Sequence, residues 1–222
     1  NWSIIRFPFV YGDADRHLEM LPHHVEAFGF HPANHMSTIH HRDIATAMDQ
    51  LKIGIVKLTM LLERQTNFFL SEHVNKSFPP FLNLKKPGLT LALQGLQFVA
   101  TSTTAQNQSF AFPHSVHSIP TNADNQDVVS MGTDAALIVS KVLENAYVVA
   151  AIEAIALAQA VDCHDDHARL GGAGKELVKQ IRTVVASVKE DRSLAPEAEA
   201  LSHALKRFFF KPDWFRKFIE IP

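Results

Sequence analysis

The residues best suited to chemistry lie between His114 and Gly132, where amide, hydroxyl and carboxylate side chains precede a long apolar segment. Asn122, Asn125 and Gln126 contribute carboxamide groups, which both donate and accept hydrogen bonds. The apolar segment predicts a helix, whose free N–H groups and positive dipole end favour a negatively charged ligand. The stretch is therefore a candidate binding site for a small polar molecule. Because Asn, Asp and Ser also favour helix starts, a simple capping loop is the alternative interpretation.

Three other groups of residues resemble chemical sites, but a structural explanation suits each of them better. The histidines at positions 17, 23, 24, 31, 35, 40 and 41 do not repeat a compact ligand spacing, so we expect no metal site. Cys163 stands beside His164 and His167, but neighbours in a loop rarely share a catalytic geometry. Gly171–Lys175 lacks the first Gly and the final Ser or Thr of a phosphate loop, so it predicts a flexible break before a helix.

A long helix must position the polar stretch. We expect it from about Ser130 to about Val161, which is on the order of 45 Å at 1.5 Å per residue. It carries Ala on several sides, so it requires close helix neighbours, as in a large bundle or an oligomer core.

Other segments show the same helical periodicity. An apolar stripe at Met48, Leu51, Ile55, Leu58 and Leu62 predicts a core-facing helix. Further helices are expected over 90–106, 175–190 and 196–206, with an irregular stretch over 71–90. A short strand is expected over 4–10. The predicted fold is mainly α, a long-helix bundle preceded by a short α/β-like N-terminal segment.

Composition limits the classes of function. The 222 residues carry a formal net charge of −2, which gives no broad attraction to nucleic acid or to an anionic membrane. The single Cys163 cannot form a disulfide within the chain, so a cytoplasmic location is the expectation. The most apolar window, 146–161, is short for a bilayer span and is interrupted by Glu153 and Gln159, so we expect no membrane segment.

Residues from about 48 to 205 resemble the C-terminal part of the histidine and aromatic amino acid ammonia-lyases and the related 2,3-aminomutases. The segments that carry the resemblance keep their order and spacing; they are Met48–Lys52, Leu62–Gln65, Pro79–Leu82, Pro87–Leu89, Pro113–Gly132 and Glu190–Leu194. The resemblance implies a nearly all-helical fold with long central helices that associate into a tetramer-like homo-oligomer. It also implies an aromatic amino acid as the substrate.

The same resemblance implies roles for the carboxamides. Gln126 occupies the position where histidine-specific members carry Glu and aromatic-specific members carry Gln. A carboxylate can pair with an imidazole, whereas a neutral amide tolerates a phenyl ring, so Gln126 favours phenylalanine or tyrosine. Asn122 and Asn125 are the further candidates for substrate binding. The helix start near Ser130 would add positive potential toward the electrophile.

The family's catalytic groups have no counterpart in this chain. Its methylidene-imidazolone electrophile forms from an Ala-Ser-Gly tripeptide, which does not occur in the 222 residues. The catalytic tyrosine and the carboxylate-binding arginine also lie earlier in the family's sequences. Elimination of ammonia needs an electrophile and a base. The resemblance therefore implies a chain that is inactive alone, binds no cofactor itself, and needs a complementing lyase chain to provide the methylidene-imidazolone.

Residues 1 to about 47 resemble a different family, the extended short-chain dehydrogenases and epimerases, through Arg6, Val10–Gly12 and His40–Ala45. The glycine-rich dinucleotide turn and a Tyr-x-x-x-Lys pair are absent. The expected organisation is a dehydrogenase-like fragment over 1–47, a lyase-like helical domain over 48–207 and an aromatic, basic tail over 208–222. Two alternative functions remain: a non-catalytic helical scaffold or oligomerisation subunit, and a fragment of an NAD(P)-dependent epimerase or dehydrogenase.

Overall fold

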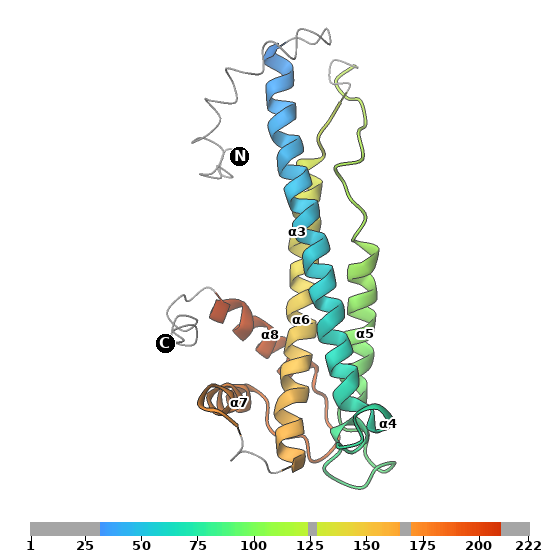
Figure 1. Ribbon diagram of the computed structural model, residues 1–222, viewed down its shortest axis with the longest axis vertical. Helices are drawn as coiled ribbons and strands as arrows, with labels where there is room; N and C mark the ends of the chain where they lie inside the picture. The colour runs from blue at the N-terminus through green and yellow to red at the C-terminus, as the bar shows by residue number, and fades with distance from the viewer. Residues whose placement is uncertain (1–31, 124–127, 165–169, 210–222) are drawn as a thin grey trace. The chain divides into compact units, whose positions relative to one another are not determined.

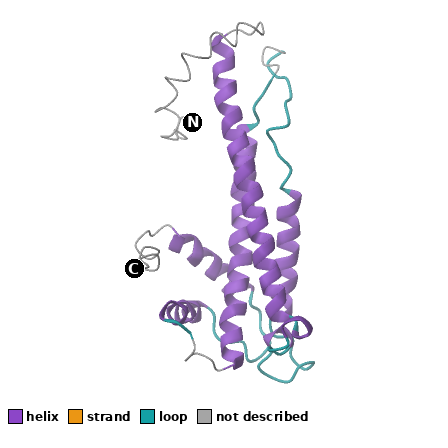
Figure 2. Ribbon diagram, viewed as in Figure 1, coloured by secondary structure: helices purple, strands orange, loops and turns teal. Residues whose placement is uncertain are grey.

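The computed structural model describes residues 32–123, 128–164 and 170–209, and within these ranges every regular element is helical (Figures 1 and 2). The long helices are α3 (Pro32–Leu70), α5 (Gln94–Ser109) and α6 (Gly132–His164). Two shorter helices follow, α7 (Gly172–Val184) and α8 (Ala195–Phe209). The mainly helical fold is therefore confirmed, whereas the strand predicted over 4–10 lies outside the described residues.

The chain divides into two compact units. Unit 1 comprises Asn1–Met48 and Pro113–Ala135, and unit 2 comprises Asp49–Phe112 and Ala136–Pro222. Helix α3 continues without interruption through the boundary predicted near residue 47, because no Pro or Gly follows Pro32 until Gly54. The domain boundary itself stays a prediction.

Unit 2 contains the hydrophobic core. In this unit α3, α5 and α6 run side by side, and α7 and α8 follow α6 in the chain (Figure 1). The core is centred on the second half of α6, where Val149, Ile152 and Ile155 are almost fully buried. Leu82 and Leu93 close it from the irregular segment that joins α3 to α5. That segment contains α4 (Glu72–Asn75) and a single 3₁₀ turn, η3 (Pro80–Leu82).

Buried polar side chains on α3, α5 and α6 hold the three long helices together. Asn107 of α5 donates from Nδ2 to Oγ1 of Thr59 on α3 (3.3 Å) and to the carbonyl of Val142 on α6 (3.1 Å). Asn145 of α6 returns a 2.9 Å bond to Oδ1 of Asn107. Because a buried amide is costly when its partners are misplaced, this network fixes the register of α3, α5 and α6.

The predicted apolar stripe on α3 does not form the core face, and this expectation was wrong. Leu51 and Leu58 are 49% and 52% exposed, whereas the buried face consists largely of polar side chains. The buried polar residues of α3 are Asp49, Lys52, Thr59, Glu63 and Thr66. The physical reason is that these side chains bond to one another, to the helix backbone or to neighbouring segments, which lets polar groups occupy the interior.

Helix α6 extends beyond the apolar window 146–161 at both ends. By length and composition it could cross a membrane, with a mean hydropathy of 1.6 over its best 18 residues, and 44% of that window is buried inside the structure. The core helix of a soluble protein passes the same test. The second half of α6 packs in the centre of unit 2 and carries buried Gln159, which is the behaviour of a core helix.

Helix α7 differs from its expected range at both ends. It begins at Gly172 rather than Lys175 and ends at Val184 rather than near Glu190. Gly171 is therefore the N-cap, and the predicted break is the helix start itself. The segment after α7 is extended at Val185, whose side chain is fully buried, so packing ends the helix early.

Candidate functional site

The predicted binding loop lies in unit 1 between Pro113 and Met131. Asn122 is exposed, and Asn122 and Ala123 both adopt left-handed backbone conformations, with φ of 56° and 51°. Asn tolerates this region better than most residues, so a tight turn at this point suits the sequence. Asn125 and Gln126 lie outside the described residues, so the structure does not test their predicted roles.

The two sides of the loop are tied together. The backbone N–H of Val129 donates a 2.9 Å hydrogen bond to Oγ of Ser118. The N–H of His117 bonds to the carbonyl of His114, and the two imidazole rings meet edge to face with centroids 5.7 Å apart. Nδ1 of His114 is buried and has no hydrogen-bond partner in the described part of the chain. The loop is therefore a closed structure whose ends are held close together.

The point where the chain leaves unit 2 for this loop is fixed by a buried cation. Nζ of Lys52 lies 2.7 Å from the carbonyl oxygen of Phe112 and 2.7 Å from Oδ1 of Asp49. The Lys52 side chain is fully buried, and that of Asp49 is 5% exposed. A charge-assisted bond of this length is among the stronger ones in proteins. Lys52 thus holds the residue directly before Pro113.

Helix α6 begins directly after the loop. The first backbone bond runs from Ala135 N–H to the carbonyl of Met131 at 3.0 Å, and Asp134 lies in the first turn. The prediction that a long helix starts just after the polar stretch is confirmed within two residues. The unpaired N–H groups of this first turn give the loop a positive partial charge.

Two polar side chains, Gln159 on α6 and Asp191 between α7 and α8, bind backbone groups of neighbouring segments. Gln159 is fully buried and pairs with both backbone groups of Val188, accepting from N–H at 3.0 Å and donating to the carbonyl at 2.9 Å. It also donates to the carbonyl of Leu82 at 3.3 Å. Asp191 accepts hydrogen bonds from the N–H groups of Leu91 and Ala92. These contacts hold the segments on either side of η3 and before α8.

The charged side chains of Glu63 and Arg192 form contacts within the fold. Glu63 is bound by the adjacent Arg64 and accepts a 3.0 Å hydrogen bond from Thr101 of α5, so it joins α3 to α5. Arg192 pairs with Glu197 at 3.0 Å rather than with Asp191. In both pairs a carboxylate is neutralised by a guanidinium, which is typical of structural contacts.

Cys163 is not a reactive nucleophile in this fold. Burial, together with the neighbouring carboxylate of Asp162, raises the pKa of the Cys163 thiol to about 11. A thiol with such a pKa is almost entirely protonated at neutral pH, which suits a structural cysteine. His167 lies outside the described residues. Within the described part of the chain, no group of three or more His, Cys, Asp or Glu side chains is placed to hold a metal ion.

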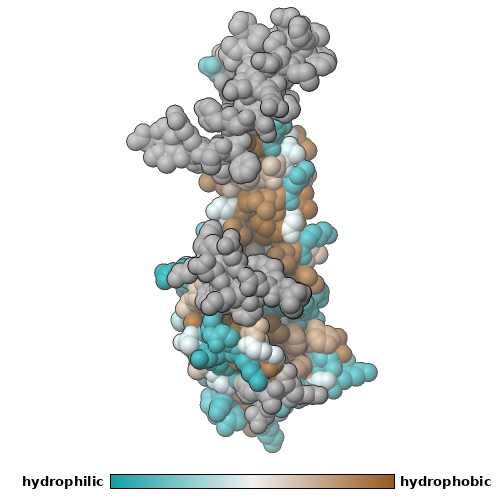
Figure 3. Space-filling view, turned by 60° about the vertical axis from the view of Figure 1, so that its left-hand side comes forward, coloured by the Kyte–Doolittle hydropathy of each residue, from teal (hydrophilic) through white to brown (hydrophobic). Residues whose placement is uncertain are grey.

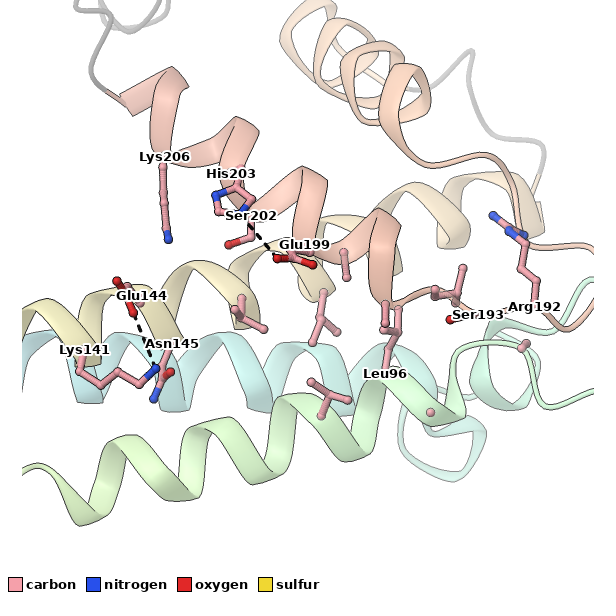
Figure 4. Close-up of a pocket in the computed structure, with 18 residues that line it drawn as sticks. Leu96, Lys141, Glu144, Asn145, Arg192, Ser193, Glu199, Ser202, His203 and Lys206 are labelled. Atoms are coloured by element: carbon pink, nitrogen blue, oxygen red, sulfur yellow. Dashed lines mark ion pairs between the residues drawn. The ribbon is translucent and has the colours of Figure 1, made fainter.

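A groove of about 550 Å³ lies in unit 2 between α5, α6, α8 and the segment that leads into α8 (Figure 4). The ion pairs around it join Lys141 to Glu144 at 3.6 Å and His203 to Glu199 at 3.8 Å. Their side chains are 52–76% exposed. Exposed pairs of this kind contribute little energy and are typical of a solvated surface.

Sequence reasoning missed two buried charges, Lys52 and Glu153. Lys52 was noted only within a segment that carries the family resemblance, and Glu153 only as an interruption of an apolar window. The sequence carries no signal for the burial of Lys52, because a charged pair such as Asp49 and Lys52 at i,i+3 usually lies on an exposed helix face. The signal for Glu153 was an acid alone among Ala, Ile and Leu on a helix that must be buried.

Comparison with known proteins gives a consistent relationship. A family model described as aromatic amino acid lyase matches residues 31–183. The chain is 39% identical over 178 residues to an MIO-dependent tyrosine 2,3-aminomutase from Streptomyces globisporus, a match that covers 80% of this chain and 32% of that protein. It is 39% identical over 175 residues to a histidine ammonia-lyase from Bacillus subtilis, covering 78% and 34% of the two chains.

Solved structures agree with these relatives. The crystal structure of a tyrosine aminomutase from Streptomyces globisporus superimposes with a TM-score of 0.76 at 37% identity, covering 82% of this chain and 34% of that chain. The chain therefore spans about a third of the length of the curated relatives it matches. The matched region begins at residue 31, so it includes part of the segment that resembled a dehydrogenase.

Proposed function

Because this chain belongs to the aromatic amino acid lyase family, we propose that it is the C-terminal part of an aromatic amino acid ammonia-lyase or 2,3-aminomutase. The reaction is removal of ammonia from a phenylalanine, tyrosine or histidine-type substrate to give an arylacrylate, or migration of that amine. The observation that carries the proposal is the match over residues 31–183, which includes the whole polar loop and all of α6.

In this proposal the loop before α6 forms one wall of the substrate site. Gln126 faces the substrate ring, and its neutral carboxamide favours phenylalanine or tyrosine over histidine. Asn122 and Asn125 supply further hydrogen-bonding groups. Two features of the described residues support the role: the Ser118–Val129 bond closes the loop, and the first turn of α6 adds positive potential beside it.

The residues of this chain do not fit the family's electrophile. No Ala-Ser-Gly occurs in the sequence, so methylidene-imidazolone cannot form from it. We therefore assign no catalytic residue to this chain and propose that activity requires a complementing lyase chain. The contribution of this chain is then to position a substrate wall on a rigid helix end, which is a binding and orienting role.

The partner surface in this proposal is the apolar face of the long helices. Leu51, Leu58 and Leu61 on α3 are about half exposed, and Leu137 on α6 is 65% exposed. Figure 3 shows apolar side chains gathered on one face of the molecule. Leucines at this density are typical of a helix–helix interface, so we propose a homo-oligomer with a tetramer-like bundle. A cytoplasmic location is part of the same proposal.

A non-catalytic helical scaffold is the second candidate. The observation in its favour is that the buried polar contacts of unit 2 fix the register of the helices. The groove between α5, α6 and α8 carries exposed ion pairs, which are typical of a solvated surface. A scaffold would assemble without converting an amino acid. The epimerase or dehydrogenase fragment has no support from the described residues, because the motifs that suggested it lie largely before residue 32.

The test is complementation. The full chain is purified alone and together with a lyase chain that carries Ala-Ser-Gly but lacks the region matching residues 31–183. Each sample is analysed by native mass spectrometry and assayed in the near ultraviolet for arylacrylate from phenylalanine and tyrosine. We expect product only from the mixed sample. A mixed oligomer without product supports the scaffold, and product from the complementing chain alone contradicts a role for this chain.

A further inference from the structure

A second cavity, of about 420 Å³, lies within unit 2 where α6, α7 and α8 meet. Nine of its twelve described lining residues are apolar; they include Leu157 of α6, Leu177, Ile181 and Val184 of α7, and Leu201 of α8. Its volume lies within the range of small-molecule sites in proteins, about 300–1,000 Å³. None of its described lining residues belongs to the loop that carries the proposed substrate wall.

One charge-bearing side chain lines this apolar space. Glu153 of α6 is only 8% exposed, and it has no hydrogen-bond or ion-pair partner among the described residues. Desolvation raises the pKa of its carboxyl to about 7. A buried carboxylate without a counter-charge is costly, so the ionised form of Glu153 would be stabilised by a cation placed in the cavity.

The other polar groups that line the cavity indicate whether a ligand there would be a cation or an anion. Nε2 of Gln180 is engaged with Glu176 at 3.0 Å, and the hydroxyl of Thr183 donates to the carbonyl of Gln180 at 2.6 Å. No Lys, Arg or His is among the described lining residues, and Glu153 is the single titratable group there from α6, α7 and α8. An anion would find no counter-charge, whereas a cation would find one.

We propose that this cavity binds a primary ammonium ion with an apolar body, its charged nitrogen against the carboxylate of Glu153 and its hydrocarbon part against Leu157, Ile181 and Leu201. A charge-assisted bond in a desolvated site is strong, and the hydrocarbon part gains from burial. An amino acid is excluded, because its own carboxylate would enter an apolar space that offers no cation. The site therefore differs from the proposed substrate wall in its residues and in its ligand.

The experiment is calorimetric titration of the full chain with 2-phenylethylammonium at pH 8. Phenylalanine is the matched ligand control, since it keeps the ring and the ammonium and adds a carboxylate. Glu153→Gln removes the charge with little change in shape. Glu144→Gln, on the exposed turn of the same helix, is the matched protein control. Circular dichroism of each variant shows that the fold is retained.

We expect binding of 2-phenylethylammonium by the parent chain and by Glu144→Gln, at least tenfold weaker binding by Glu153→Gln, and no binding of phenylalanine. Affinity should also fall about tenfold from pH 8 to pH 6, because the carboxylate of Glu153 becomes protonated. No measurable binding at pH 8 overturns the proposal. Equal binding by folded Glu153→Gln, or equal binding of phenylalanine, overturns it as well. None of these outcomes depends on a complementing chain.

Discussion

Lys52 donates a 2.7 Å hydrogen bond to the carbonyl oxygen of Phe112, the residue that directly precedes the loop with Asn122, Asn125 and Gln126. The same ammonium group pairs with Asp49. A side chain one turn after the start of unit 2 thus fixes a point sixty residues later in the chain. This buried contact fixes the backbone of Phe112, at the end of the unit 2 segment that precedes the loop.

Replacing Lys52 by Met should destabilise the chain strongly. The substitution keeps most of the apolar stem of the side chain but removes the cation from buried Asp49 and the donor from Phe112, which costs about 3–5 kcal/mol. The free energy of unfolding from urea titration measures this loss. Lys57→Met, at an exposed position of the same helix, should change the value by less than about 0.5 kcal/mol. Similar values for the two variants would contradict the role of Lys52.

The sequence predicts the long helices, because the length of the apolar segments and the helical spacing of their apolar residues are enough to define them. The start of α6 was placed within two residues, since a polar stretch gives way there to a long apolar run. The buried face of α3 could not be predicted in this way. Asp49 and Lys52 at i,i+3 normally mark an exposed helix face, and only the contact with Phe112 makes burial favourable. Leu51 and Leu58 were consequently assigned to the wrong side.

Replacing Gln159 by Leu tests the contact between α6 and the segments around Leu82 and Val188. The change keeps the volume of the side chain but leaves the N–H and carbonyl of Val188 without their buried partner. We expect a loss of about 2–4 kcal/mol in the free energy of unfolding. Gln65→Leu, at an exposed position of α3, serves as the control. A variant as stable as the parent chain would show that Val188 finds other partners.

Glu153 should make stability depend on pH in a defined direction. In the folded chain its carboxyl keeps the proton up to about pH 7, whereas its ordinary pKa is 4.5. The folded state binds more protons between these values, so the free energy of unfolding falls as pH rises from about 4.5 to 7, by roughly 3 kcal/mol.

The difference between the parent chain and Glu153→Gln isolates this effect from other titrating groups. Measured by urea unfolding at pH 5 and pH 8, the stability of Glu153→Gln relative to the parent chain should be higher at pH 8 than at pH 5. Glu144→Gln should show no such change. A difference that is the same at both pH values would mean that Glu153 is ionised in the folded chain at pH 5.

The thiol of Cys163 should react slowly. With a pKa near 11 rather than the ordinary 9.0, its thiolate fraction at pH 8 is about 100-fold lower than that of a free cysteine. The rate of alkylation by iodoacetamide at pH 8 should therefore be about 100-fold lower in the native chain than in the chain unfolded by urea. Equal rates in the two states would restore the hypothesis of a nucleophile–base cluster at Cys163.

Whether Gln126 forms part of a substrate wall is tested most directly in the complemented enzyme. There, kcat/KM for tyrosine is compared between the parent chain, Gln126→Ala and Gln126→Glu, with Gln65→Ala as control and native mass spectrometry to confirm equal assembly. Loss of a hydrogen-bonding group at the substrate should lower kcat/KM at least about tenfold in Gln126→Ala, and Gln126→Glu should shift preference toward histidine. Unchanged kcat/KM and preference in both Gln126 variants, at equal assembly, would contradict the account.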